Sequence, residues 1–155
     1  MTATRRASGA ASKRAGEAWE RYVSGQWLEP LRKLGVLTCW HKLEPRKVGD
    51  RFVADAGADF VACVRSGEYV AIECKQTMGR RFPRSSISAV QVEHLDAVPR
   101  SFLALLIDGR RFLIPWSKVP WVTLRSAKSV TADDCAIWEL KQGEWLQALA
   151  LRLQG

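Results

Sequence analysis

The feature that most constrains this chain is the stretch 57–77, "GADFVACVRSGEYVAIECKQT", in which two apolar runs flank a turn. "FVACV" and "YVAIECK" are typical of strands, and "RSGE" between them carries the glycine that a tight turn favours, so the stretch predicts a β-hairpin. Charged residues are uncommon in strand interiors, yet this stretch contains Asp59, Glu73 and Lys75. Any fold built on the hairpin must therefore accommodate two acids and a lysine at its sheet.

The hairpin pattern places these three residues on one surface. Alternate residues of a strand share a face, so Glu73 and Lys75 point the same way. A three-residue loop at 65–67, with Gly67 in the left-handed conformation, sets Asp59 opposite Glu73, whereas a two-residue turn would shift this register by one. The longer loop therefore predicts two facing carboxylates beside a lysine.

Two facing carboxylates repel each other unless a cation neutralises them. Carboxylate oxygens suit Mg²⁺, for which we expect Mn²⁺ to substitute. Such a site indicates metal-assisted phosphodiester hydrolysis, with Lys75 orienting the attacking water or stabilising the transition state. A salt-bridged hairpin on a solvated face is the alternative that an isolated E-x-K pattern leaves open.

The rest of the chain predicts one sheet with helices around the hairpin. Helical spacing runs from Lys13 to Leu34, where Pro30 should kink or split the helix near Glu29. Further strands are expected at 36–40, 102–107 and 111–114, a helix at 85–98, and a basic loop across 41–59. This α-β-β-β-α-β-β order predicts an α/β fold with a central mixed sheet flanked by helices.

The two ends of the chain are expected to differ from this core. Residues 1–12 are small and polar with two arginines and predict a flexible basic arm. A capping-box-like start at Thr131 and Asp134 predicts a C-terminal helix that Gly143 divides. The expected organisation is the arm, a core domain at 13–120, and a C-terminal helical extension at 121–155 packed on the same domain.

Charge and cysteine content narrow the classes of function. Lys and Arg number 24 against 16 Asp and Glu, and the net charge of +8 favours a polyanionic partner. No apolar run approaches the roughly 18 residues of a membrane span, so we expect a cytoplasmic protein with no membrane partner. From the positive charge we expect DNA as the partner and no small-molecule substrate. The four cysteines form no C-x-x-C pair and are expected to be small buried hydrophobes.

Asp59, Glu73, Cys74 and Lys75 have the form of the PD-(D/E)-x-K nuclease signature, with Ala58 in place of the proline. Beyond it, "KRAGEAWER" (13–21), "ADFVACVRSGEYVAIECKQT" (58–77), "QVEHL" (91–95) and "RFLIPWSKV" (111–119) resemble, in the same order, segments of archaeal Holliday-junction resolvases. The portion 72–95 also resembles bacterial RecU-type resolvases. The resemblance implies a restriction-endonuclease-like core and a homodimer that resolves four-way DNA junctions by paired nicks in strands of like polarity. A phage-encoded relative acting in the host cytoplasm is one source that fits.

The resemblance also implies roles for individual residues. The implied catalytic set is Glu20, Asp59, Glu73, Lys75 and Gln91, and the implied metal ligands are Asp59, Glu73, Glu20 and the backbone carbonyl of Cys74. Basic and polar residues near this set are candidates for phosphate contacts, which bind the DNA backbone without reading sequence. These DNA-binding candidates are Arg14, Arg46, Lys47, Arg51, Thr77, Arg80, Arg81 and Arg84.

Two other functions stay open. One is a nuclease of the same superfamily with a restriction, repair or transposition target, which would cut linear duplex as well. The other is a non-catalytic DNA-binding module on the same fold. The intact set of three acids and a lysine argues against the module.

Overall fold

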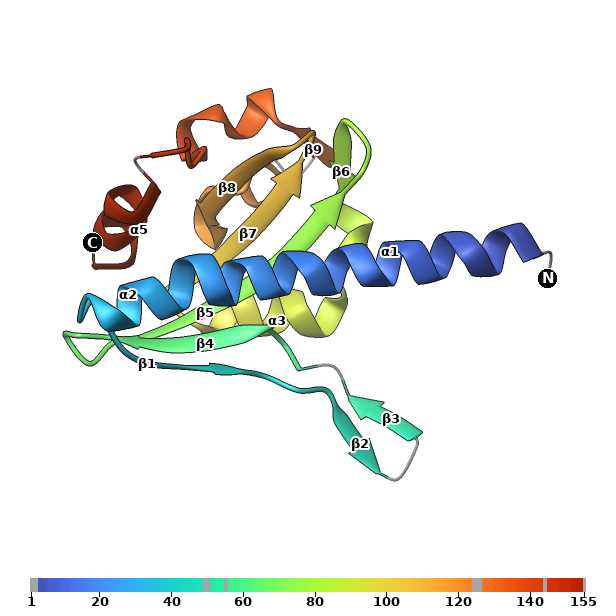
Figure 1. Ribbon diagram of the computed structural model, residues 1–155. Helices are drawn as coiled ribbons and strands as arrows, with labels where there is room; N and C mark the ends of the chain where they lie inside the picture. Colours follow the sequence, from blue (N-terminus) through green and yellow to red (C-terminus); the bar gives the residue numbers. More distant parts are fainter. Residues whose placement is uncertain (1–2, 49–50, 55, 124–126, 144, 155) are drawn as a thin grey trace.

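A five-stranded mixed sheet forms the centre of the molecule (Figure 1). The computed structural model describes residues 3–48, 51–54, 56–123, 127–143 and 145–154. Strands β5 and β7 run parallel, and the other neighbouring strands of the sheet run antiparallel. In sheet order the strands are β1 (Leu37–Lys42), β4 (Phe60–Val64), β5 (Tyr69–Thr77), β7 (Ser101–Ile107) and β8 (Arg110–Pro115). This architecture confirms the predicted fold class.

Helices cover both faces of the sheet, with α1 (Ala3–Tyr22) crossing in front of it and α3 (Ala89–Ala97) lying behind it in Figure 1. Trp19 of α1 is buried in the core on the first face, and its Nε1 donates to the Ala104 carbonyl at 3.0 Å. Leu95 of α3 and Leu103 of β7 belong to a second core on the opposite face. None of the described helices is both long and apolar enough to span a membrane.

The β4–β5 hairpin has the predicted register. Phe60 is opposite Ile72, and the Val64 amide donates to the Glu68 carbonyl at 3.0 Å across a three-residue loop. Gly67 in that loop has φ +90°, a conformation that glycine adopts without the strain of a side chain. Continuing the same ladder by one step sets Asp59 opposite Glu73.

Pro30 alters the helix before it but does not end the helical path. Residues Val23–Leu28 form a π-helix that joins α1 to α2 (Glu29–Lys33). Pro30 lies in the first turn of α2, directly after the π-helix. The wider turn of the π-helix is a physical alternative to the predicted kink, since it relieves crowding between the proline ring and the preceding turn.

Two segments for which the sequence predicts no regular structure contain a helix or strands in the structure. Residues 3–12, expected to be a flexible arm, belong to α1, because alanine and arginine favour helix and extending a packed helix needs no new nucleus. The expected loop at 41–59 contains a short hairpin, β2 (Arg46–Val48) with β3 (Arg51–Ala54). Strands this short contain too few alternations for a sequence pattern to reveal them.

The C-terminal segment is less helical than predicted. Thr131 and Asp134 do exchange capping-box hydrogen bonds, at 2.7 and 3.3 Å, but the turn that follows is a 3-10 helix over Asp133–Trp138. Gly143, with φ +93°, then separates this segment from α5 (Trp145–Gln154). The remaining elements are β6 (Arg81–Pro83) paired with β9 (Ser129–Thr131), α4 (Pro120–Thr123), and 3-10 helices at Arg84–Ser86 and Trp116–Lys118.

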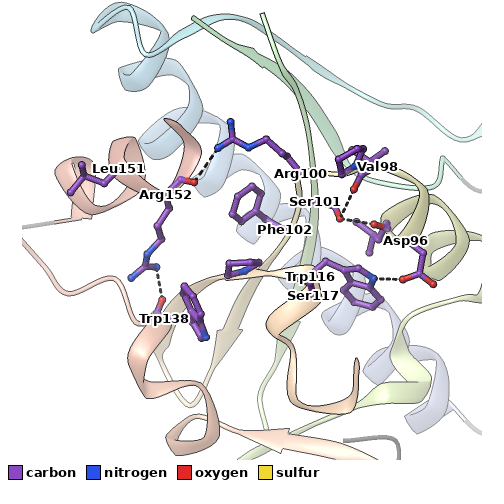
Figure 2. Close-up of a pocket in the computed structure, with 13 residues that line it drawn as sticks. Asp96, Val98, Arg100, Ser101, Phe102, Trp116, Ser117, Trp138, Leu151 and Arg152 are labelled. Atoms are coloured by element: carbon purple, nitrogen blue, oxygen red, sulfur yellow. Dashed lines mark hydrogen bonds between the residues drawn. The ribbon is translucent and has the colours of Figure 1, made fainter. Parts of the chain in front are cut away.

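Helix α5 docks on the core through apolar and polar contacts. Leu149 and Leu153 are buried in the core on the α1 face. Arg100, which precedes β7, donates to the carbonyl oxygens of Arg152 and Leu153, the latter at 2.6 Å. Arg152 in turn donates to the Trp138 carbonyl at 2.7 Å (Figure 2). These bonds satisfy the last carbonyls of α5 and join the C-terminal segment to the start of β7.

Candidate functional site

A cleft of about 640 Å³ lies beyond the start of β4, between α1, β5 and α3. Four predicted site residues line it together with Cys74: Glu20 from α1, Asp59, Lys75 from β5, and Gln91 from α3. Glu73, the fifth, is buried and contacts both Lys75 and Gln91. The fold therefore brings the whole predicted catalytic set together from four separate segments.

Asp59 is fixed where β4 begins. Its Oδ2 accepts a hydrogen bond from the Cys74 amide at 2.7 Å, which ties the carboxylate to the neighbouring strand. Burial raises the pKa of Asp59 to about 6, although the bond from Cys74 acts in the opposite direction. The negative charge of Glu20 raises the pKa of Asp59 further. The site therefore holds this carboxylate in an environment that disfavours its charge.

Glu73 is more deeply buried, with 1% of its side chain exposed. Its Oε1 lies 2.6 Å from the Lys75 ammonium and accepts a hydrogen bond from Gln91 Nε2 at 2.5 Å. Its Oε2 is buried and has no hydrogen-bond partner among the residues that the structure describes. Burial, and then the charge of Asp59, raise the pKa of Glu73 to about 8. A buried carboxylate in this state is stabilised by a proton or by a cation.

Gln91 reaches Glu73 because it also forms the start of α3. Its Oε1 accepts from the Ser88 amide at 3.0 Å, and the Ser88 hydroxyl accepts from the Gln91 amide at 3.3 Å, which completes a capping box. With the carbonyl oxygen engaged in the cap, the amide nitrogen is directed to Glu73. The position of the helix and the orientation of the carboxylate are thus set by the same side chain.

Glu20 has a cationic partner that the sequence analysis missed. Lys42 Nζ lies 3.0 Å from Glu20 Oε2, and this hydrogen bond raises the pKa of Lys42. Lys42 ends β1 opposite Phe60, so only the strand pairing brings it to the cleft. Lys13 also lines the cleft. Arg14, the next residue and a predicted DNA-binding residue, is exposed on α1 and does not line the cleft. Helical spacing from Glu20 could have indicated Lys13, since seven residues make two turns.

The acids of the cleft fit a hard divalent cation. Mg²⁺ typically takes one or two protein carboxylates, and the buried Glu73 Oε2 offers an unshared oxygen beside Asp59. The Cys74 side chain is buried in the core on the α1 face, and burial raises the pKa of its thiol well above the usual value. Among the residues that the structure describes, no group of three or more His, Cys, Asp or Glu is arranged to hold a metal ion. A site on these residues therefore rests on two acids, with Glu20 engaged by Lys42.

The remaining predicted DNA-binding residues lie on segments that extend from one side of the sheet. In Figure 1 the N-terminal half of α1 extends to the right, the β2–β3 hairpin lies at the lower right, and β6 lies at the upper right. Arg80, Arg81 and Arg84 are exposed around β6. Thr77 ends β5, and its Oγ1 accepts from the Gly79 amide at 3.1 Å. The side chains of Arg46, Lys47 and Arg51 lie outside the described part of the structure, which gives only the backbone of their hairpin.

A second cavity, at the start of β7, carries no comparable chemistry (Figure 2). Trp116 Nε1 donates to Asp96 at 2.6 Å, and the Ser101 hydroxyl donates to the Leu95 carbonyl at 2.5 Å. Arg100 and Arg152, which also line it, donate to backbone carbonyls and fix α5. The polar groups of this cavity therefore serve the packing of the chain.

Comparison with solved structures gives a similarity to Archaeoglobus fulgidus Hjc, a Holliday junction resolvase from an archaeal hyperthermophile. The TM-score is 0.52 with 19% sequence identity, over 85% of this chain and 98% of that chain. No protein-family model and no curated protein sequence matches. The predicted resemblance to archaeal resolvases is thus confirmed at the level of the fold, a central mixed sheet flanked by helices.

Proposed function

We propose that this chain is a metal-dependent endonuclease that cuts four-way DNA junctions by paired nicks. The observation that carries the proposal is the pair of half-buried Asp59 and buried Glu73 beside Lys75, at a cleft lined by α1 and by the segment that precedes the β2–β3 hairpin. A fold stabilised only by packing gains nothing from a buried acid that faces a half-buried one, because their repulsion and desolvation lower its stability. The similarity to a Holliday junction resolvase supports the choice of substrate.

Each residue of the cleft has a role in this proposal. Asp59 and Glu73 would hold Mg²⁺, with the Cys74 carbonyl as a further expected ligand and Glu20 as another once it exchanges Lys42 for the cation. When bound, Mg²⁺ supplies the Lewis acidity that phosphodiester hydrolysis needs. Lys75 Nζ orients the attacking water or stabilises the charge that develops on the phosphate oxygens. Gln91 is a positioning residue, because it acts through Glu73.

In the proposed hydrolysis, one P–O bond of the phosphodiester forms and one breaks. Water attacks phosphorus in line, and the bond to the 3′ oxygen breaks, which leaves a 3′ hydroxyl and a 5′ phosphate. Two such nicks in strands of like polarity yield ends that a ligase can join. A homodimer supplies one cleft for each of the two nicks.

We assign DNA binding to the basic side chains around the cleft. Arg80 and Arg81 contact phosphates on one side of the cleft, and Arg14 on α1 with Arg46, Lys47 and Arg51 of the β2–β3 hairpin on the other. Each phosphate contact releases counterions, so the affinity should fall steeply with salt. Changing Arg80 and Arg81 together to alanine should weaken binding and make the logarithmic salt slope shallower by about 2. An unchanged slope would remove them from the DNA face.

The decisive experiment compares a fixed four-way junction with linear duplex of the same sequence, each in Mg²⁺ and in EDTA. Wild type is run beside Asp59→Asn, and Asp108→Asn in the exposed β7–β8 turn is the matched control. Symmetric, metal-dependent nicks confined to the junction, lost only in Asp59→Asn, are the expected result. The oligomeric state is measured by sedimentation with and without junction.

Other outcomes select the other functions. Equal cutting of linear duplex would keep the cleft chemistry and assign a different DNA target. Tight junction binding with no cutting by wild type in Mg²⁺ or Mn²⁺ would indicate the non-catalytic module. Cutting that persists in Asp59→Asn would place the chemistry outside this cleft.

A further inference from the structure

Two cysteines that are distant in the sequence are direct neighbours in the sheet. Cys39 of β1 pairs with Cys63 of β4 in the antiparallel register. Opposed residues of such a pair have Cα atoms about 4.5–5.5 Å apart, within the range of about 4.4–6.8 Å that disulfides span. The Cys39 thiol opposite it is the main cause that raises the pKa of Cys63, so Cys63 is the thiol that reacts second in the oxidation proposed below. Both are free thiols in the structure.

The pair lies where a small oxidant can reach it. Cys39 and Cys63 are half-buried, whereas the other two cysteines, Cys74 and Cys135, are buried. Alternate residues of β4, such as Ala62, pack in the core under α1, so Cys63 faces the opposite side of the sheet. None of the described residues in the core on that opposite side comes from β1 or β4. The sheet face around the two thiols is therefore not sealed by that core.

We propose that Cys39 and Cys63 form a reversible oxidation site, at which a peroxide converts them into a cross-strand disulfide. The thiolate of one cysteine attacks a peroxide oxygen, the O–O bond breaks, and a sulfenic acid and one water form. The second thiol attacks that sulfur, the S–O bond breaks, and a second water leaves. For hydrogen peroxide, two thiols thus lose two electrons and two protons, and the two oxygens leave as water. A thiol reductant reverses the reaction by exchange.

This inference stands apart from the nuclease proposal, because it needs neither the cleft nor DNA. The bond would close the loop from β1 to β4, which contains the β2–β3 hairpin and Asp59. A cross-link at the base of that loop reduces the number of conformations open to it. The site is therefore a modification site with a defined structural consequence.

The test uses the whole protein and peptide mapping without reduction. Hydrogen peroxide at a few equivalents, or a thiol reductant, is followed by alkylation of the unfolded protein and tryptic digestion. The four cysteines fall on four different tryptic peptides: 34–42, 52–65, 66–75 and 129–141. The expected product is peptide 34–42 joined to 52–65, lighter by two hydrogens than their sum and lost on reduction, while the peptides of Cys74 and Cys135 stay alkylated.

Controls separate this outcome from nonspecific oxidation. Cys39→Ser and Cys63→Ser should each abolish the joined peptide while circular dichroism stays unchanged. An equal mixture of ¹⁵N-labelled and unlabelled protein should give joined peptides of one isotope only, because the bond lies within one chain. Independent oxidation of the two thiols, a link to Cys74 or Cys135, or joined peptides of mixed isotopes would each overturn the proposal.

Discussion

Replacing Glu73 by glutamine should stabilise the metal-free protein while it abolishes cutting. The amide has nearly the same shape and can still accept hydrogen bonds from Lys75 and Gln91 at its oxygen, but it carries no charge. In wild type that charge must be buried or neutralised by a proton. The substitution therefore removes a cost that only the functional site requires.

The size of this cost follows from the raised pKa of Glu73, about 8 in the folded protein against 4.5 ordinarily. Because the folded pKa is the higher one, the stability contributed by the protonated group is fully present below pH 4.5 and is lost as the pH rises toward 8. At pH 7 the loss spans about 2.5 pKa units, or about 3 kcal/mol. Glu73→Gln should recover that amount at pH 7 and almost nothing at pH 4.

The assay is urea unfolding in EDTA from pH 4 to pH 8 for wild type, Glu73→Gln and a control, Glu93→Gln, on the exposed surface of α3. The difference in unfolding free energy should grow with pH for Glu73→Gln and stay flat for the control. Adding Mg²⁺ should narrow the difference, because a cation that binds the native site stabilises wild type. A difference that is independent of pH, or that shrinks as the pH rises, would show that Lys75 keeps Glu73 ionised at no cost and would refute the reasoning.

Three further outcomes test other parts of the structure. Gly57→Ala should destabilise the protein by about 1–3 kcal/mol, because Gly57 has φ +74° and a Cβ there would lie 2.8 Å from His94 Cγ. In a double-mutant cycle measured by urea unfolding, His94→Ala should recover the part of this loss that comes from the clash with His94, and not the part that comes from the positive φ. Gln91→Ala should lower junction cutting roughly 10–100-fold with binding retained in a gel-shift assay, and an unchanged rate would remove Gln91 from the site. Trp19→Phe should cost about 1–3 kcal/mol in thermal unfolding because the buried Ala104 carbonyl loses its donor, whereas a neutral result would mean that another donor replaces it.

Much of the fold was predictable because its signals are local. The apolar strands on either side of "RSGE" and the glycine in the turn fix the hairpin and its register, and the register alone places Asp59 opposite Glu73. The alternation of β5 likewise puts Glu73 and Lys75 on one face. Segments without a strong local pattern were not predictable: the β2–β3 hairpin is too short, and the C-terminal segment follows its contacts with β8 and the core more than its capping signal.

The sequence by itself determined the hairpin, the sheet it belongs to, and the placement of Asp59, Glu73 and Lys75 together on that hairpin. Only the tertiary structure decided which distant groups meet there: Lys42 beside Glu20, Gln91 on Glu73, and Cys39 against Cys63. The physical reason is that strand register is set by turn chemistry and alternation within a few residues, whereas contacts between elements depend on how whole faces pack. The same packing removes water from Glu73 and so creates the raised pKa that no sequence pattern contains.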